Sequence, residues 1–310
     1  MIIFSSPKPF LPSTSPVQLS AIRSWRIACP RVPIFLFGDA HHLRLICEKE
    51  ALRYGGPLGV TQQGGEILAD MFIQMTTEYP EETLLYLNSD ILLEPHFMKT
   101  MGETDRISAP WLASCRRWCL PPWQGEAREG EGLQAFFEGI DQRGHYGPVF
   151  AMDLFLLRGI NLRAMPPFRI GHAGWDNWMM YHARMRGIPV LDLSPAIRAC
   201  HCDHDYSYAK GNSSPDCRDG ILEEENMGIL QEENRRFHLG HSTHEWRQGK
   251  PVARTGRSFR HRQFEAWLAK NPRHQFWIRP LKRLFHPLVK KLEKATDLAE
   301  DWRLKSFPHA

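Results

Sequence analysis

Two features that would place a chain in a membrane or outside the cell are missing from this sequence. Its 310 residues contain no apolar run that approaches the ~18 residues of a membrane-spanning helix. Residues 1–8 show no basic stretch followed by a long apolar one, so we predict no secretory signal. We therefore expect a cytoplasmic globular protein, long enough for one large α/β domain with an appendage or for two small domains.

Cysteine is sparse, and its spacing follows no regular pattern. The seven cysteines are odd in number, which favours reduced thiols over a disulfide framework. A structural zinc site is an alternative, because Cys115 precedes Cys119 closely and because Cys200 and Cys202 flank His201. Neither pair has the tight two-residue spacing of a zinc knuckle, which counts against zinc.

Acidic residues are scarce near the C-terminal end. Residues 250–294 hold thirteen Lys and Arg but two Glu, a balance of +11, and the whole chain carries +4, which leaves −7 for the remainder. Aromatic residues alternate with these cations, at Phe259, Arg260, Phe264, Trp267, Phe276, Trp277, Arg279, Lys282, Arg283 and Phe285. A helix of this composition would lie on an anionic bilayer, although a helix packed on the rest of the chain with a solvated basic face explains it equally well. No nucleic-acid-binding motif is present, so we expect no nucleic acid partner.

Short apolar runs alternate with segments of helical period over the first ninety residues. The runs predict strands at residues 2–4, 33–37 and 83–90, and the periodic segments predict helices at 17–28, 42–53 and 66–79. This order implies a mostly parallel sheet covered by helices. Such sheets bind ligands beyond the carboxyl ends of their strands.

The later part of the chain is less regular. We expect loops over residues 105–145, a helix over 174–186, an acidic helix over 221–238, and strands at 149–157, 189–193 and 196–200. The resulting organisation is one α/β domain over residues 1–240 and a basic, aromatic-rich helical tail over 241–310.

Carboxylates follow two of the expected strands. Asp90 ends the apolar run after Asn88, and Asp39 ends the run at 33–37. A carboxylate at the carboxyl end of a buried strand can hold a divalent cation against a diphosphate, and Asn88 can add an amide oxygen or bond a ribose. Asp39 is suited to nucleoside hydroxyls, and Lys8 follows the first strand closely enough to approach the nucleotide. The alternatives are an Asx turn at Asp90, a helix N-cap at Asp39 and a solvated Lys8.

Together with later motifs, these residues resemble nucleotide-sugar-dependent glycosyltransferases of the GT-A type. The matching segments cover about residues 1–210 and are Pro7–Phe10, Phe37–Asp39, Leu87–Ile91, Pro166–Phe168, Gly174–Trp178 and His201–Tyr206. The sequence departs from the family pattern at Asn88 and Cys119, where the family has Asp. The resemblance implies a GT-A fold with a C-terminal helical extension, a nucleoside-diphosphate sugar donor, a glycan or lipid-linked acceptor, and Mn²⁺ or Mg²⁺.

The resemblance also suggests a catalytic base. An inverting sugar transfer needs one carboxylate to accept the proton of the acceptor hydroxyl, and Asp176 is our choice. The indoles of Trp175 and Trp178 would dry the pocket and raise the proton affinity of Asp176, and Trp175 could stack on a sugar. The alternative is a helix N-terminus with both indoles in the core.

The remaining candidates surround this base and the metal. His201 and His204 follow the last expected strand, and one of them would ligate the metal with Asp90. The donor would further contact Asn177 and the two arginines Arg116 and Arg117, which suit a diphosphate. Asp153 interrupts an apolar strand and would bind a sugar hydroxyl.

We therefore predict a glycosyltransferase that works by direct displacement, in surface polysaccharide or lipopolysaccharide synthesis, with its basic tail at the inner face of a membrane. A sugar-phosphate nucleotidyltransferase is an alternative, but it needs a Gly-rich, Arg-containing loop after the first strand, where this chain has Ser5–Lys8. A third reading is a non-catalytic protein on a transferase-like fold that binds polyanions or membranes.

Overall fold

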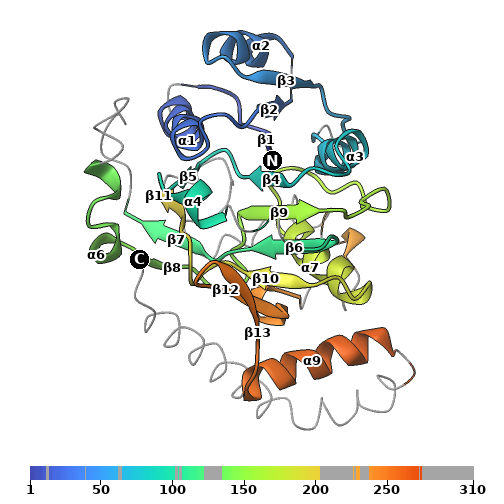
Figure 1. Ribbon diagram of the computed structural model, residues 1–310. Coiled ribbons are helices and arrows are strands. Elements are labelled where there is room, and N and C mark those ends of the chain that lie inside the picture. Colours follow the sequence, from blue (N-terminus) through green and yellow to red (C-terminus); the bar gives the residue numbers. More distant parts are fainter. Residues whose placement is uncertain are drawn as a thin grey trace.

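A nine-stranded sheet runs through the centre of the molecule (Figure 1). The computed structural model describes residues 1–11, 14–38, 40–61, 65–101, 104, 107–121, 135–202, 226, 228–230, 237–271 and 273. From one edge to the other, the strands are β13 (Lys250–Ala253), β12 (His244–Arg247), β10 (Val190–Asp192), β6 (Trp111–Ser114), β9 (Leu154–Arg158), β4 (Leu84–Leu87), β1 (Ile2–Ser5), β2 (Ile34–Phe37) and β3 (Arg53–Gly56). Within this sheet, β9 and β13 run antiparallel to the other strands, which confirms the predicted mostly parallel α/β sheet.

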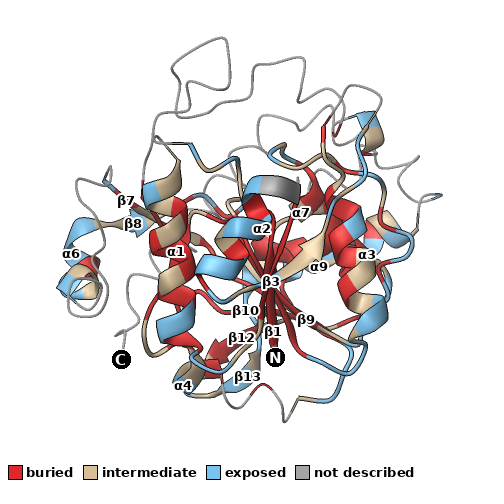
Figure 2. Ribbon diagram, turned by 90° about the horizontal axis from the view of Figure 1, so that it is seen from above, coloured by how far each residue is buried: buried red, intermediate tan, exposed pale blue. Residues whose placement is uncertain are grey.

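Helices cover both faces of the sheet (Figure 2). One face packs on α1 (Ser15–Ala28), α2 (Ala40–Lys49) and α4 (Phe97–Met101), and the other on α3 (Leu68–Glu78), α7 (Trp175–Met185) and α9 (Arg257–Lys270). Successive strand residues point to opposite faces, so Ile3 of β1 joins the first core while Ile2 and Phe4 join the second. Where both faces are buried, as at β2 and β4, the strands are apolar or aromatic along their length, whereas β3, β12 and β13 toward the edges carry polar residues.

A second sheet lies at the carboxyl edge of the first. Its order is β5-β11-β7-β8, with β5 at Ile91–Leu93, β11 at Ala199–Cys202, β7 at Arg117–Leu120 and β8 at His145–Tyr146. Strands β4, β6 and β10 of the main sheet lead directly into β5, β7 and β11. The short α6 (Ile140–Arg143) precedes β8. This continuity brings three strand-to-strand connections, with their polar residues, to one edge of the fold.

Two predictions about secondary structure are wrong. The expected helix over residues 42–53 ends at Lys49, and Arg53 begins β3, because Ala51 adopts a φ of 52° and the chain then pairs with β2. The region 105–145, expected as loops, contains β6 and β7. The four residues of β6 are all buried and show no period of two in the sequence. Pairing with β9 and β10 decides their conformation.

The main sheet continues past residue 240. The turn η3 (Leu239–His241) leads into β12, which pairs in parallel with β10, and β13 then forms the edge. Helix α9 follows and packs against η3 and α7. Part of the segment expected as a helical tail is therefore sheet, while the division of the chain into two domains stays a prediction. The expected acidic helix at 221–238 lies mostly outside the described residues.

A buried ion pair joins the end of β5 to the start of β11 in the second sheet. Glu94, after β5, accepts hydrogen bonds from the Arg198 backbone N–H and guanidinium, both at 3.0 Å, and each residue is 5% exposed. We expect Glu94→Gln to lower the free energy of unfolding by about 3 kcal/mol, because it removes the buried carboxylate from the Arg198 guanidinium and leaves it paired with Asp141, whose side chain is 55% exposed. Urea denaturation measures this, with Glu82→Gln as the control, since the Glu82 side chain is 50% exposed and its pair is worth about 1 kcal/mol or less. Equal stability of both variants would contradict the assignment.

Within the described part of the chain, no helix is both long enough and apolar enough to pass through a bilayer.

Candidate active site

Polar residues from four strands meet at the carboxyl edge of the main sheet. Lys8 follows β1, Asn88 and Asp90 follow β4, and Arg117 lies just beyond β6. Asp153 directly precedes β9, which runs antiparallel to these strands and therefore begins at the edge where they end. These candidate residues therefore lie at the carboxyl edge of the sheet, where sheets of this type bind ligands.

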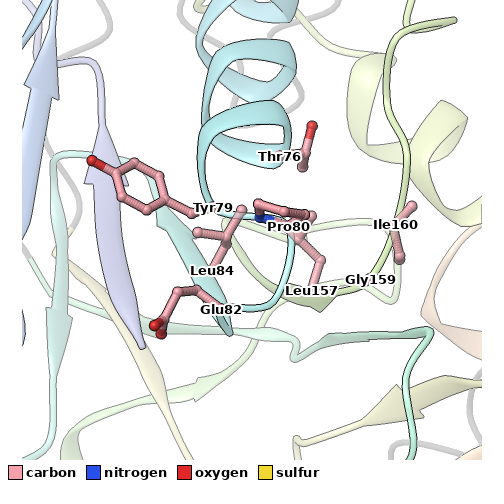
Figure 3. A pocket seen from close by; sticks show the side chains of 8 residues that line it. All are labelled: Thr76, Tyr79, Pro80, Glu82, Leu84, Leu157, Gly159 and Ile160. Carbon is pink, nitrogen blue, oxygen red and sulfur yellow. The ribbon is translucent and has the colours of Figure 1, made fainter.

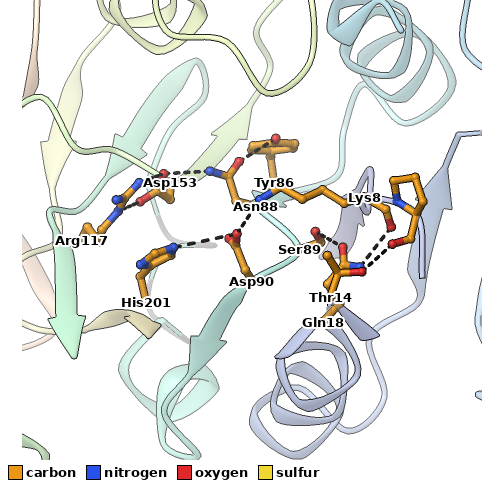
Figure 4. A network of polar contacts seen from close by, with 11 residues as sticks. Lys8, Thr14, Gln18, Tyr86, Asn88, Ser89, Asp90, Arg117, Asp153 and His201 are labelled. Carbon is orange, nitrogen blue, oxygen red and sulfur yellow. Dashed lines mark hydrogen bonds and ion pairs between the residues drawn. The ribbon is translucent and has the colours of Figure 1, made fainter. Parts of the chain in front are cut away.

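Asp90 lies between two cationic or potentially cationic groups (Figure 4). Its Oδ2 is 3.5 Å from the Lys8 Nζ and 3.9 Å from the His201 Nε2. The Asp90 side chain is 14% exposed and that of Lys8 is 35% exposed, so the pair borders solvent, whereas His201 is buried on β11. The sequence predicts that either His201 or His204 shares a metal with Asp90, and the structure brings the His201 and Asp90 side chains together.

A second network includes Asn88, two positions before Asp90 in the chain. The Tyr86 hydroxyl donates to the Asn88 Oδ1 at 2.9 Å, and the Asn88 Nδ2 donates to the Asp153 Oδ1 at 2.8 Å. Arg117 also binds Asp153. The Arg117 Nη2 donates to the Asp153 Oδ1 at 2.9 Å, and the Arg117 Nε contacts the Asp153 Oδ2. The buried Asp153 carboxylate therefore has a positive partner, which burial of a charge requires. Both ends of the Asn88 amide are engaged, which fixes its orientation.

Helix α1 holds the two loops that carry Lys8 and Asp90. The Gln18 Nε2 donates to the Lys8 carbonyl at 3.0 Å, and the Ser89 hydroxyl donates to the Gln18 Oε1 at 2.7 Å (Figure 4). The Trp25 indole N–H donates to the Ile91 carbonyl at 2.6 Å. One helix thus positions both sides of the Lys8–Asp90 pair.

Asp176 approaches the same region from α7. It lies in the first turn of that helix, where its Oδ1 accepts from the Gly174 N–H at 3.2 Å. Burial, and secondarily the charge of Asp153, raise the pKa of Asp176 from 3.8 to about 6, against the lowering effect of the backbone N–H groups. The pKa of Tyr86 is raised by burial and then by the charges of Asp153, Asp90 and Asp176. The charges of three carboxylates therefore act on one phenol, which relates the Asp90 part of the site to Asp176.

The residues beside Asp176 pack into the core. Trp175 is 7% exposed, and its ring lies 5.1 Å from Tyr86 and 5.2 Å from Phe155, between centroids. Trp178 is equally buried, and the Asn177 Nδ2 donates to the Phe237 carbonyl at 2.6 Å. The indoles supply the low-polarity surroundings expected beside Asp176, but the buried Trp175 ring offers no open face for a sugar. Asn177 ties α7 to the segment at Phe237.

Arg116, a further candidate, makes its contacts elsewhere in the fold. Arg116 is 3% exposed, and its Nε donates to the Gly147 carbonyl at 2.8 Å, so its guanidinium supports the loop before Asp153. Its backbone N–H donates to the Ser194 hydroxyl at 2.9 Å. Asp39 and His204 lie outside the described residues, so their predicted roles stay predictions.

The donor set fits a divalent cation in part. An imidazole nitrogen and a carboxylate oxygen 3.9 Å apart can become neighbouring ligands of one ion after a small shift, and such a mixed N,O set suits Mn²⁺ better than Mg²⁺. The Asn88 amide oxygen accepts from the Tyr86 hydroxyl and keeps a second lone pair, so its predicted part in binding a cation or a ribose stays a prediction. Among the residues that the structure describes, no three His, Cys, Asp or Glu side chains gather around one point, so a diphosphate and water would have to complete the ligand set. This finding also leaves the zinc alternative without support in those residues.

Two residues of the site were not found from the sequence. Tyr86 has the only hydroxyl within β4, and a polar tip in an otherwise aliphatic strand was the available signal. Gln18 is 2% exposed on α1, and a glutamine on the buried face of an amphipathic helix could have marked it.

A small cavity elsewhere can be set aside. It lies between the end of α3 and the start of β4, at the amino edge of the sheet (Figure 3). Its volume is about 10 Å³, which holds at most one water molecule, so it cannot take a nucleotide.

No family model matches the chain, and no curated protein matches it. Among solved structures, it is similar to a mannosyltransferase from Pyrobaculum calidifontis in complex with GDP-Man and Mn²⁺, with 11% identity over 75% of this chain and 70% of that one and a TM-score of 0.40. It is also similar to a protein from Desulfovibrio desulfuricans G20 described as a nucleotide-diphospho-sugar transferase, with 13% identity over 74% and 95% of the two chains and a TM-score of 0.38. A mycobacterial protein shares 12% identity over 76% and 75%, with a TM-score of 0.41. At these identities and scores, the likenesses carry no argument about the site.

Proposed function

We propose that the chain is a glycosyltransferase that moves a sugar from a nucleoside-diphosphate sugar to an acceptor hydroxyl on a glycan or a lipid-linked glycan. The observation that carries the proposal is a set of contacts at the carboxyl edge of the sheet. Asn88 joins Tyr86 to Asp153, and Asp90 lies 3.5 Å from the Lys8 Nζ and 3.9 Å from the His201 Nε2. The charge of Asp176 also acts on Tyr86. Carboxylates alone would repel a diphosphate, but Lys8 and Arg117 supply positive charge at the same edge.

The proposed reaction is a direct displacement at the anomeric carbon. The acceptor oxygen bonds to that carbon, the bond from the carbon to the diphosphate oxygen breaks, and Asp176 takes the hydroxyl proton. With a pKa of about 6, Asp176 is ionised at neutral pH yet more basic than an ordinary Asp. A divalent cation at Asp90 and His201, when bound, would supply positive charge to the departing nucleoside diphosphate.

Lys8 has a role in this scheme that depends on its pairing with Asp90. We expect Lys8→Met to weaken binding of a nucleoside diphosphate about tenfold, since a charge-assisted hydrogen bond to phosphate is lost. The same change should strengthen binding of Mn²⁺ alone, because the Asp90 carboxylate no longer faces an ammonium group at 3.5 Å. Isothermal titration calorimetry measures both affinities, with the exposed Lys99→Met as the control. If neither affinity changes, Lys8 does not face the nucleotide.

The donor class is tested by thermal-shift measurements against UDP-, GDP-, CMP- and dTDP-sugars, each with and without Mn²⁺. The proposal predicts stabilisation by one nucleotide family, larger with the cation present, because a ligand of the folded state alone raises the melting temperature. A flat response across the whole panel would count against an enzyme and favour a binding protein on this fold.

A further inference from the structure

One side of α9 carries an exposed stripe of cations and aromatic rings. Arg257, Arg260, Phe264, Trp267 and Lys270 are exposed and follow one another at steps of three or four residues, which places them along one side of a helix. Phe264 is 47% exposed and Trp267 is 44% exposed. Their rings are nearly parallel, with centroids 5.9 Å apart. Two stacked aromatic rings thus lie in solvent between arginines and a lysine.

The inner side of α9 is fixed to the fold by charged groups. Glu265 lies 3.4 Å from the His241 Nε2 of η3 and 3.0 Å from the Arg262 NH1, and Gln263 contacts Arg184 of α7. Ala266 and Leu268 are buried. The helix therefore has a set orientation, and its exposed stripe contributes little to holding it in place.

A positively charged cavity opens at the start of the same helix. It has a volume of about 340 Å³ and is lined by Arg247, Arg254, Arg257, Ser258 and Glu245, among others. Glu245 neutralises part of this charge, because it pairs with Arg247 and lies 3.1 Å from the Arg254 Nε. Three guanidinium groups against one carboxylate still leave an excess of positive charge, and the volume admits a phosphate-bearing headgroup. Arg257 belongs to both the cavity and the stripe, so the two are continuous.

We propose that this face of α9 docks on an anionic membrane, with Phe264 and Trp267 in the interface and a lipid phosphate in the arginine cavity. Cations beside a pair of aromatic rings match a surface that is negative at the headgroups and apolar just beneath them. An inorganic polyanion would use the arginines but would gain nothing from two exposed rings. The inference does not depend on the proposed sugar transfer, although it would bring a lipid-linked acceptor to the enzyme.

Sedimentation of the full chain with vesicles tests the surface, with phosphatidylcholine vesicles compared with vesicles that also contain phosphatidylglycerol. We expect binding only to the anionic vesicles. Arg257→Gln with Arg260→Gln should weaken it about 25-fold, since each cation near the surface contributes about fivefold. Phe264→Ser with Trp267→Ser should weaken it by a similar factor. The matched controls are Arg31→Gln with Arg163→Gln for charge and Leu45→Ser with Val60→Ser for exposed apolar area, and they should bind as the parent does.

Several results would overturn the inference. Vesicle binding that survives loss of both aromatic rings, while it disappears with the arginines, would assign the surface to a soluble polyanion. Equal losses in the control variants would show that no specific face is involved. Inorganic phosphate should compete with vesicles for the cavity, and this competition would support a phosphate site there. If phosphate does not compete and Arg247→Gln binds vesicles as the parent does, the cavity is removed from the proposal. Donor binding is measured separately by thermal shift, so a failure of one proposal is distinguishable from a failure of the other.

Discussion

Asp176→Asn is expected to abolish sugar transfer while making the folded chain more stable at neutral and alkaline pH. The amide keeps the shape of the carboxylate and can still accept from the Gly174 N–H, but it cannot take a proton from the acceptor hydroxyl. Loss of a general base lowers the rate on the order of 10²–10⁴-fold. Nucleoside-diphosphate affinity should change little, which separates a lost base from a lost binding site.

The gain in stability follows from the direction of the pKa shift. Burial raises the pKa of Asp176 from 3.8 to about 6, so between these values the folded chain binds more protons than the unfolded chain. The free energy of unfolding therefore falls as pH rises through about 4 to 6, and the full cost of ionising Asp176 is present above pH 6. At pH 8 the Asn variant lacks that cost and should be more stable by about 1–3 kcal/mol.

Urea denaturation of both proteins at pH 8 and pH 4 measures this effect. The stabilisation should be largest at pH 8 and small at pH 4, where the carboxyl of the folded wild type is protonated and pH is close to the unfolded-state pKa of 3.8. The wild-type kcat/KM should correspondingly rise with pH through about 6 and then level off, since the free enzyme needs an ionised base. Suppose the variant is inactive, but its gain in stability over the wild type is no larger at pH 8 than at pH 4. That result would show that Asp176 is not held in the low-polarity surroundings described above.

Asp90→Asn is expected to remove the dependence of nucleotide binding on a divalent cation. The change leaves a weaker oxygen ligand opposite His201 and releases Lys8 from its ion pair. Loss of the carboxylate beside that imidazole should lower Mn²⁺ affinity at least 10–100-fold, the range seen when a group supporting a metal site is removed. Turnover should fall at least as far, because less positive charge is held near the departing diphosphate.

Calorimetry with a nucleoside diphosphate, with and without Mn²⁺, distinguishes this outcome from a general loss of structure. Glu81→Gln, an exposed change of the same kind near the start of β4, serves as the control and should behave as the wild type. If Asp90→Asn retains the full effect of Mn²⁺ on nucleotide affinity, the cation binds elsewhere and the assignment of Asp90 fails.

The parts of the site that could be predicted from the sequence are those set by local pattern. The apolar run of β4 ends immediately before Asn88, so a strand end marks that residue, whereas Asp153 is expected inside a strand over residues 149–157 but directly precedes β9. Because parallel strands end at one edge, the proximity of Asn88 and Asp90 to Lys8 follows from the fold class. His201 reaches Asp90 because β11 pairs with β5 in the second sheet. Their grouping does not require any knowledge of side-chain contacts.

The parts that could not be predicted depend on pairings between distant segments. Arg117 meets Asp153 across 36 positions, and Arg198 meets Glu94 across 104, and neither spacing leaves a periodic trace in the chain. The adjacent arginines Arg116 and Arg117 look equivalent in sequence, yet the first supports Gly147 and the second holds Asp153. Strand β7 alternates its side chains between two faces, and only the position of the second sheet decides which arginine reaches the site.

The position of a bound cation tests the central claim most directly. Crystals grown with Mn²⁺ and the nucleoside diphosphate chosen by thermal shift would give an anomalous scattering peak at the metal. We predict one peak within bonding distance of the Asp90 carboxylate and the His201 Nε2, with the diphosphate beside Lys8 and the sugar side facing Asp176. A nucleotide bound at another edge of the sheet, or a cation that touches neither Asp90 nor His201, would contradict the account.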